Sequence, residues 1–286
     1  TNAVGEALSR LQETTGAEVK RANYQGDIGL HVAKTMWGIK KLLKDTDRKF
    51  KDIEQLELSE RVNFLSEAYM IGSEYYDDIE DGKAIEEIQD INYYLFQLVY
   101  SSISKREFKN FDELGMNQWY RKGRMWCLEQ FEDIYDTLGT DFDYYFFESE
   151  VGEIGYKMVK ENIGKIFKDD EGAVIYEGDP DKGLHTRVFI NQFGLPTYEA
   201  KEIGLAKAKS QKADWDESIM ITDKSQAPYF AVVLDVLSKL LPKYASVANH
   251  VSHGVIALPG MKKMSSRKGE VVSAKELLKS TQEAVK

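Results

Sequence analysis

A group of cationic and hydroxyl side chains stands in the segment GMKKMSSRKGEVVS, residues 260–273. Glycines flank these side chains, and Ser273 with Glu276 forms a capping box that predicts a helix directly after them. Lysine, arginine and serine donate hydrogen bonds to anions, and flanking glycines let a backbone move. The segment therefore predicts either a loop that acts on an anionic group or an exposed basic turn. Its central residues are Lys263, Met264, Ser265, Ser266 and Arg267.

The composition describes an acidic protein with enough apolar residues for a sizeable core. Hydrophobic residues make up 42% of the 286 residues, a length that suits one large domain or two smaller ones. The net charge of -10 argues against a protein that coats nucleic acid non-specifically. The single cysteine, Cys127, excludes an intrachain disulfide and indicates a reducing compartment. With no secretory signal and no apolar run of membrane length, we expect a cytoplasmic protein without a membrane partner.

Helical periodicity alternates with short apolar segments, which predicts an α/β fold with a parallel sheet. Helices are predicted at residues 1–16, 30–43, 117–139, 151–163, 195–210 and 225–240. Strands are predicted at residues 17–24, 141–149, 184–190, 217–223 and 245–258. Residues 44–112 are dominated by charged helical patterns, and residues 168–183 favour a hairpin. The first helix is expected to turn one face to the core, formed by Val4, Ala7, Leu8 and Leu11.

Several other residue patterns have both a functional and a structural interpretation. Tyr198 and Glu202 are four residues apart, which places them on one helix face, as a binding pair or as an ordinary surface pair. His250 and His253 are three apart, but the absence of a cysteine or carboxylate at ligand spacing argues against a metal site. A Walker-type phosphate loop and a complete Gly-x-Gly-x-x-Gly are missing, which argues against kinases and dinucleotide enzymes.

The segment KMSSRKG resembles the Lys-Met-Ser-Lys-Ser loop of class I aminoacyl-tRNA synthetases, which arginyl enzymes often write Lys-Met-Ser-Ser-Arg. Four segments in the same order also resemble arginyl-tRNA synthetases: NYQGDIGLHVAK, LHTRVFINQFGLPTYEAKEIGLA, DKSQAPYFAVV and HVSHGVIALPGMKKMSSRKG. The resemblance covers most of the chain from Ala3 to Val285. It implies a class I Rossmann-like parallel sheet with helical and connective insertions.

The resemblance also implies a reaction and a set of site residues. The substrates would be L-arginine, ATP with Mg²⁺, and tRNA(Arg), and no metal site in the protein is expected. The loop residues Lys263, Ser265, Ser266 and Arg267 would be catalytic, with Ser266 standing where the family usually has lysine. ATP would be bound by His253, Gly254, Lys263 and Met264. Arginine would be bound by Tyr198, Glu202, Gln226 and Asp27, with Glu202 standing where the family more commonly has aspartate.

By the same resemblance the chain is expected to be part of a longer, monomeric protein and inactive by itself. The family's His-Ile-Gly-His motif would precede Thr1, and its anticodon-binding domain would follow Lys286. The expected division is a first half of the catalytic domain at 1–45 and 113–150, and a second half at 186–258. The remaining parts are a helical insertion at 46–112, a connective insertion at 151–185, and the loop with its stem helix at 259–286.

Two alternatives remain open from the sequence. One is another class I synthetase, although a cysteinyl enzyme would need zinc ligands that a single cysteine does not supply. The other is a synthetase-like fragment that binds nucleotide or RNA without catalysis.

Overall fold

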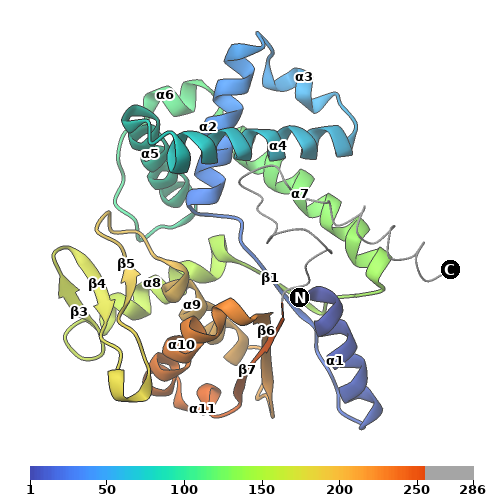
Figure 1. Cartoon of the computed structure of the whole chain (residues 1–286), viewed down its shortest axis with the longest axis vertical. Coiled ribbons are helices and arrows are strands. Elements are labelled where there is room, and N and C mark those ends of the chain that lie inside the picture. Colours follow the sequence, from blue (N-terminus) through green and yellow to red (C-terminus); the bar gives the residue numbers. More distant parts are fainter. Residues whose placement is uncertain (255–286) are drawn as a thin grey trace. The chain divides into compact units, whose positions relative to one another are not determined.

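The computed structural model describes residues 1–254, which fall into two compact units. The first unit contains residues 1–26, 99–105 and 142–254, and the second contains residues 27–98 and 106–141. Figure 1 shows the helices and strands of both. The capping box at Ser273 and Glu276 lies outside the described residues, and the five-part division expected from the sequence stays a prediction.

In the first unit, two short strands pair in parallel, as the sequence predicts for this fold. Strand β1 (Ala22–Gln25) runs beside β2 (Tyr144–Phe147), with Ala22 opposite Tyr144 and Gln25 opposite Phe147. Strand β2 is only partly buried: Phe146 lies in the core, whereas Tyr145 is 38% exposed. The strand predicted at 141–149 is therefore present, with side chains that are only partly buried.

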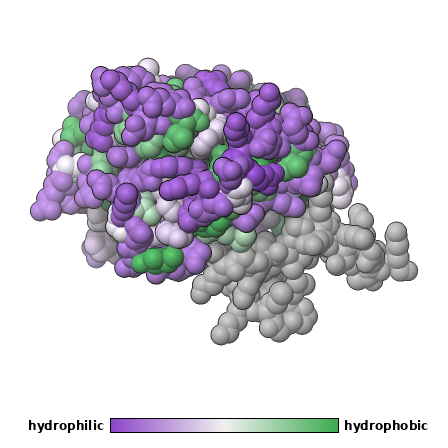
Figure 2. All heavy atoms as spheres, turned by 90° about the horizontal axis from the view of Figure 1, so that it is seen from above, coloured by the Kyte–Doolittle hydropathy of each residue, from purple (hydrophilic) through white to green (hydrophobic). Residues whose placement is uncertain are grey.

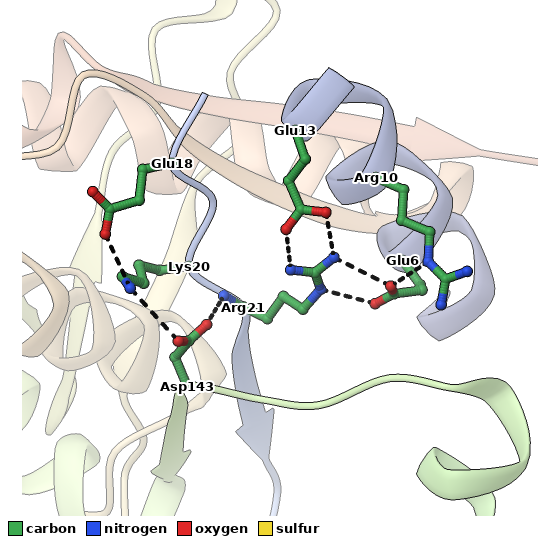
Figure 3. A network of polar contacts seen from close by, with 7 residues as sticks. All are labelled: Glu6, Arg10, Glu13, Glu18, Lys20, Arg21 and Asp143. Atoms are coloured by element: carbon green, nitrogen blue, oxygen red, sulfur yellow. Dashed lines mark hydrogen bonds and ion pairs between the residues drawn. The ribbon is translucent and has the colours of Figure 1, made fainter. Parts of the chain in front are cut away.

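Helix α1 (Asn2–Thr14) forms as predicted, but the contacts that hold it are polar. The Arg21 guanidinium donates to Glu6 at 2.9 Å and to Glu13 at 2.7 Å, and the backbone N–H of Arg21 donates to Asp143 at 2.8 Å (Figure 3). Glu6 is buried, and its hydrogen bond with Arg21 lowers the pKa of its carboxyl. This network ties α1 to the starts of β1 and β2.

The expected core-facing stripe of α1 is not buried among the described residues. Val4 is 40% exposed and Leu11 is 64% exposed. The prediction was wrong because the helix is anchored through the side that carries Glu6, and through Gly5, which lies against Ile221.

The remaining strands of the first unit form two further sheets. Strands β3 (Lys168–Asp170), β4 (Ala173–Tyr176) and β5 (Arg187–Ile190) pair antiparallel, which confirms the hairpin at 168–183. Strands β6 (Ser218–Asp223) and β7 (Ala248–His253) pair in parallel, and α10 (Ala227–Leu240) with the short α11 (Pro242–Ala245) connects them. This strand–helix–strand order confirms the expected α/β arrangement in this part of the chain.

Helices α8 (Glu148–Glu161) and α9 (Tyr198–Ser210) of the first unit pack closely through glycines. A Cβ on Gly155 would come within 3.0 Å of the Ala200 carbonyl, and one on Gly204 would do the same to the Val151 carbonyl. A helix was predicted from residue 195, but α9 begins only after Thr197. Pro196 instead forms a β-bridge with Ile190. The glycines bring the two helix backbones almost into contact.

The second unit is helical throughout its described residues, which agrees with the charged helical patterns of 44–112. Its long helices are α2 (Leu30–Asp45), α4 (Leu58–Ser73), α5 (Gly82–Val99) and α7 (Met116–Leu138), with shorter turns α3 (Phe50–Glu54), the π-helical η1 (Glu74–Asp78) and α6 (Lys109–Glu113). Gly38 and Gly72 let α2 and α4 approach backbone to backbone. Helix α7 ends at Gly139 in the left-handed conformation, φ 62°, as the sequence predicts.

The visible surface in Figure 2 is mostly hydrophilic, with apolar side chains in small separate groups. This agrees with a chain in which 30% of the residues are charged. Within residues 1–254, no helix combines the length and the apolar character that crossing a membrane requires.

The glycine contact between α8 and α9 predicts the effect of adding one methyl group. Gly204→Ala should lower the free energy of unfolding by about 1–3 kcal/mol, because the backbone of Val151 cannot move aside as a flexible side chain would. This cost should exceed the gain of about 1 kcal/mol that alanine brings to a helix. Urea denaturation measures the difference. Gly82→Ala, which meets open space in α5, is the control, and equal stability of the two variants would contradict the prediction.

Candidate active site

Two of the four residues predicted to bind arginine, Tyr198 and Glu202, stand on helix α9 of the first unit. The helix places Tyr198 and Glu202 one turn apart, as their spacing predicts. The Tyr198 ring is largely exposed, at 55%, and the Lys201 ammonium lies 5.0 Å from its centre. Tyr198 thus offers an accessible aromatic surface next to the acidic residue.

The Glu202 carboxyl is unusual in its surroundings. Its pKa is raised to about 7, chiefly by burial and to a smaller extent by the charges of Glu148 and Glu199, against an opposing effect of Lys209. Within residues 1–254 this carboxyl forms no hydrogen bond and no ion pair. A partly desolvated carboxylate without a partner favours binding of a cation.

Glu148, at the start of α8, is a neighbour of Glu202 that sequence reasoning missed. Glu148 is 4% exposed and Lys201 is 3% exposed, and the Lys201 ammonium donates to its carboxylate at 2.5 Å. The Tyr100 hydroxyl donates to the backbone carbonyl of Glu148 at 2.5 Å, which fixes the start of the helix. The only sequence signal for this residue was its position near the end of the predicted aromatic strand at 141–149.

Two half-buried tyrosines complete the surroundings of Glu202, and neither was predicted as a site residue. Burial raises the pKa of Tyr24, on β1, and of Tyr229, on α10, and the Glu202 carboxylate raises both further. The Tyr24 hydroxyl is buried and has no hydrogen-bond partner in the described part of the chain. Tyr24 lies within NYQGDIGLHVAK, one of the segments that carry the family resemblance, but nothing in the sequence indicated its role.

Gln226 and Asp27 are not on helix α9. Gln226 caps the start of α10 and is exposed, three residues before Tyr229 on the same chain segment. Asp27 belongs to the second unit, where its carboxylate accepts a hydrogen bond from Arg124 Nε at 2.6 Å. The assignment of both residues to arginine binding stays a prediction.

The residues predicted to bind ATP begin at the carboxyl end of β7. The His253 ring nitrogen Nε2 lies 2.9 Å from the hydroxyl of Thr1, which caps helix α1, and Nδ1 lies 2.8 Å from the Gly254 carbonyl oxygen. His250, by contrast, stacks on Phe230 with ring centres 4.3 Å apart and contacts Thr222. The loop residues Lys263, Met264, Ser265, Ser266 and Arg267 lie outside the described residues.

Comparison with known proteins places this architecture in a family. The family described as tRNA synthetases class I (R), catalytic domain, matches residues 1–286, so the chain belongs to the class I tRNA synthetase catalytic domains.

Its relatives are named arginine–tRNA ligases. The one from Borrelia hermsii (strain HS1 / DAH) is 26% identical over 290 residues, which cover 99% of this chain and 46% of the relative. The one from Treponema denticola is 27% identical over 284 residues, covering 99% of this chain and 44% of the relative. The chain therefore spans slightly less than half the length of these relatives.

A solved structure has the same fold. The crystal structure of arginyl-tRNA synthetase from Plasmodium falciparum aligns with a TM-score of 0.59 and 16% identity. The alignment covers 88% of this chain and 39% of that one. This likeness confirms the α/β class I fold expected from the sequence.

The raised pKa of Glu202 predicts a pH-dependent effect on stability. An ordinary glutamate has a pKa of 4.5, and Glu202 titrates at about 7, so the folded state favours its protonated form. Its contribution to stability is complete below about pH 4.5 and is lost as the pH rises through about 7. Glu202→Gln should match the wild type near pH 4.5 and be more stable by up to about 3 kcal/mol near pH 8.

Urea denaturation of both proteins at the two pH values measures this effect. Glu161→Gln, at the exposed end of α8, is the control. A difference between Glu202→Gln and wild type that stays constant with pH would contradict the assigned titration.

Proposed function

We propose that this chain is the catalytic core of an arginine–tRNA ligase, which activates L-arginine with ATP and transfers it to tRNA(Arg). The observation that carries the proposal is the Glu202 carboxyl, partly desolvated and without a partner in the described part of the chain. It stands on α9 beside Tyr198, in a chain that belongs to the class I tRNA synthetases.

The chemistry of the cluster suits a guanidinium group. A guanidinium is planar, always charged and has five N–H donors, so it requires a carboxylate and neutral acceptors around it. Glu202 supplies the carboxylate, the Tyr24 hydroxyl supplies a buried acceptor without a partner, and Tyr198 supplies an aromatic face for stacking. Binding of the substrate would lower the pKa of Glu202, because a neighbouring cation favours the ionised carboxylate.

The ATP side of the site is assigned to the end of β7 and the loop that follows in sequence. His253 and Gly254 lie where the first helical turn of α1 begins, and a helix N-terminus favours anionic groups. Activation is attack of the arginine carboxylate on the α-phosphorus of ATP, with pyrophosphate leaving. Lys263 and Arg267 would stabilise the charge that develops on the phosphates, and Mg²⁺ would accompany ATP.

The guanidinium assignment predicts a selective loss. Glu202→Ala in the full-length protein should weaken arginine binding by at least ~100-fold, because the guanidinium would lose its charged partner in a partly desolvated site. ATP affinity should change little. Isothermal titration with each ligand measures both, and Glu161→Ala is the control. Unchanged arginine affinity in Glu202→Ala would remove this residue from the site.

The loop assignment predicts a loss in rate. Replacing Lys263 and Arg267 by alanine in the full-length protein should slow arginine-dependent pyrophosphate exchange at least ~100-fold, the scale of losing one strong charge-stabilising donor. The loss should appear mainly in kcat, because these contacts form as charge develops. Arginine binding should persist. Wild-type exchange rates in the double variant would identify the segment as an exposed basic turn.

A further inference from the structure

Three carboxylates act on one another in the cluster around α9, and two of them have a cation supplied by the chain. Glu148 pairs with Lys201 at 2.5 Å, and both side chains are at most 5% exposed. Glu199 lies 3.7 Å from the Arg187 guanidinium. Glu202 forms no ion pair among residues 1–254, although the charge of Lys209 acts to lower its pKa. The chain thus supplies ion-pair partners to the neighbours of Glu202 and none to Glu202 itself within these residues.

Burying the Lys201–Glu148 ion pair costs free energy, which the surrounding contacts must offset. Removing two charges from water costs several kcal/mol for each ion, and their attraction offsets this only with good geometry and additional contacts. Here the Lys201 stem packs at Gly152, and the Glu148 carboxylate lies beside Gly26. The absence of a Cβ at both glycines leaves room for the ion pair. The pair therefore occupies a space that larger side chains at these two positions would fill.

We propose that Lys201 is a positioning residue for substrate recognition: its ion pair holds the Glu148 carboxylate in place, so that Glu202 is the carboxylate without an ion pair that meets the substrate guanidinium. This rests on the proposed arginine-binding function. Lys201 also lies under the ring of Tyr198, so one ammonium group orients both an acidic and an aromatic member of the site. No role in arginine binding follows for Lys201 from its position in the sequence alone.

The charge balance gives this role a specific consequence. Glu148 and Lys201 together are neutral, and Glu202 then matches one guanidinium. Without Lys201, the Glu148 carboxylate loses the ion pair that holds it in place. Without Glu148, the Lys201 ammonium becomes a buried cation that repels the guanidinium. Removing both restores neutrality, so the loss caused by replacing Glu148 should be partly reversed by also replacing Lys201.

The test is a double-mutant cycle on arginine binding in the full-length protein, measured by isothermal titration with L-arginine and, separately, with ATP. The variants are Lys201→Met, Lys201→Arg, Glu148→Gln and the double variant Glu148→Gln/Lys201→Met. Lys207→Met, on the same helix, is the control. Thermal melting of each variant reports whether it folds.

Lys201→Met should weaken arginine binding at least ~10-fold and leave ATP binding unchanged, and Lys201→Arg should retain most of the affinity. The double variant should bind arginine more tightly than Glu148→Gln alone. This comparison tests the positioning role of Lys201 even if Lys201→Met alone does not fold.

Three results would overturn the inference. They are wild-type arginine affinity in Lys201→Met, equal losses for arginine and ATP, and a double variant that binds no better than Glu148→Gln. Failure of the wild-type protein to bind arginine would instead overturn the proposed function.

Discussion

The close approach of helices α8 and α9 is the constraint on which the acidic cluster depends. Gly155 and Gly204 face the opposite helix so tightly that neither position can accept a Cβ without backbone displacement. This contact brings the first residue of α8, Glu148, to the N-terminal part of α9, where Lys201 and Glu202 stand. Because packed backbones resist displacement, the spacing of these charges is set by the helix pair and not by flexible loops.

That spacing has an electrostatic result. Desolvation raises the pKa of Glu202 to about 7, with smaller contributions from the Glu148 and Glu199 carboxylates and against the charge of Lys209. The chain limits the effect by placing Lys201 on Glu148 and Arg187 near Glu199. Among residues 1–254, Glu202 is then the carboxylate of this cluster that forms no ion pair, and under the proposed function it is the group that meets the substrate guanidinium.

Other parts of the first unit are held by polar contacts where the sequence suggested apolar ones. Arg21 joins Glu6 and Glu13 of α1 to the start of β1, and Asp143 receives the Arg21 backbone N–H (Figure 3). The apolar side of α1, with Val4 and Leu11, stays exposed among the described residues. The same helix brings Thr1 to His253 at the end of β7. Position along the chain and helical periodicity alone do not reveal which face of a helix is anchored by ion pairs.

The sequence by itself determined the family resemblance, the α/β class, most helices and strands, and the helical spacing of Tyr198 and Glu202. These follow from local properties: side-chain periodicity, glycine and capping signals, and short motifs. Only the tertiary structure decided that Glu148, Lys201, Tyr24 and Tyr229 belong with Glu202, since they come from β1, α8, α9 and α10. It also decided the burial and protonation of Glu202, because desolvation depends on atoms that are distant in sequence and meet only when the glycines of α8 and α9 let the helices pack.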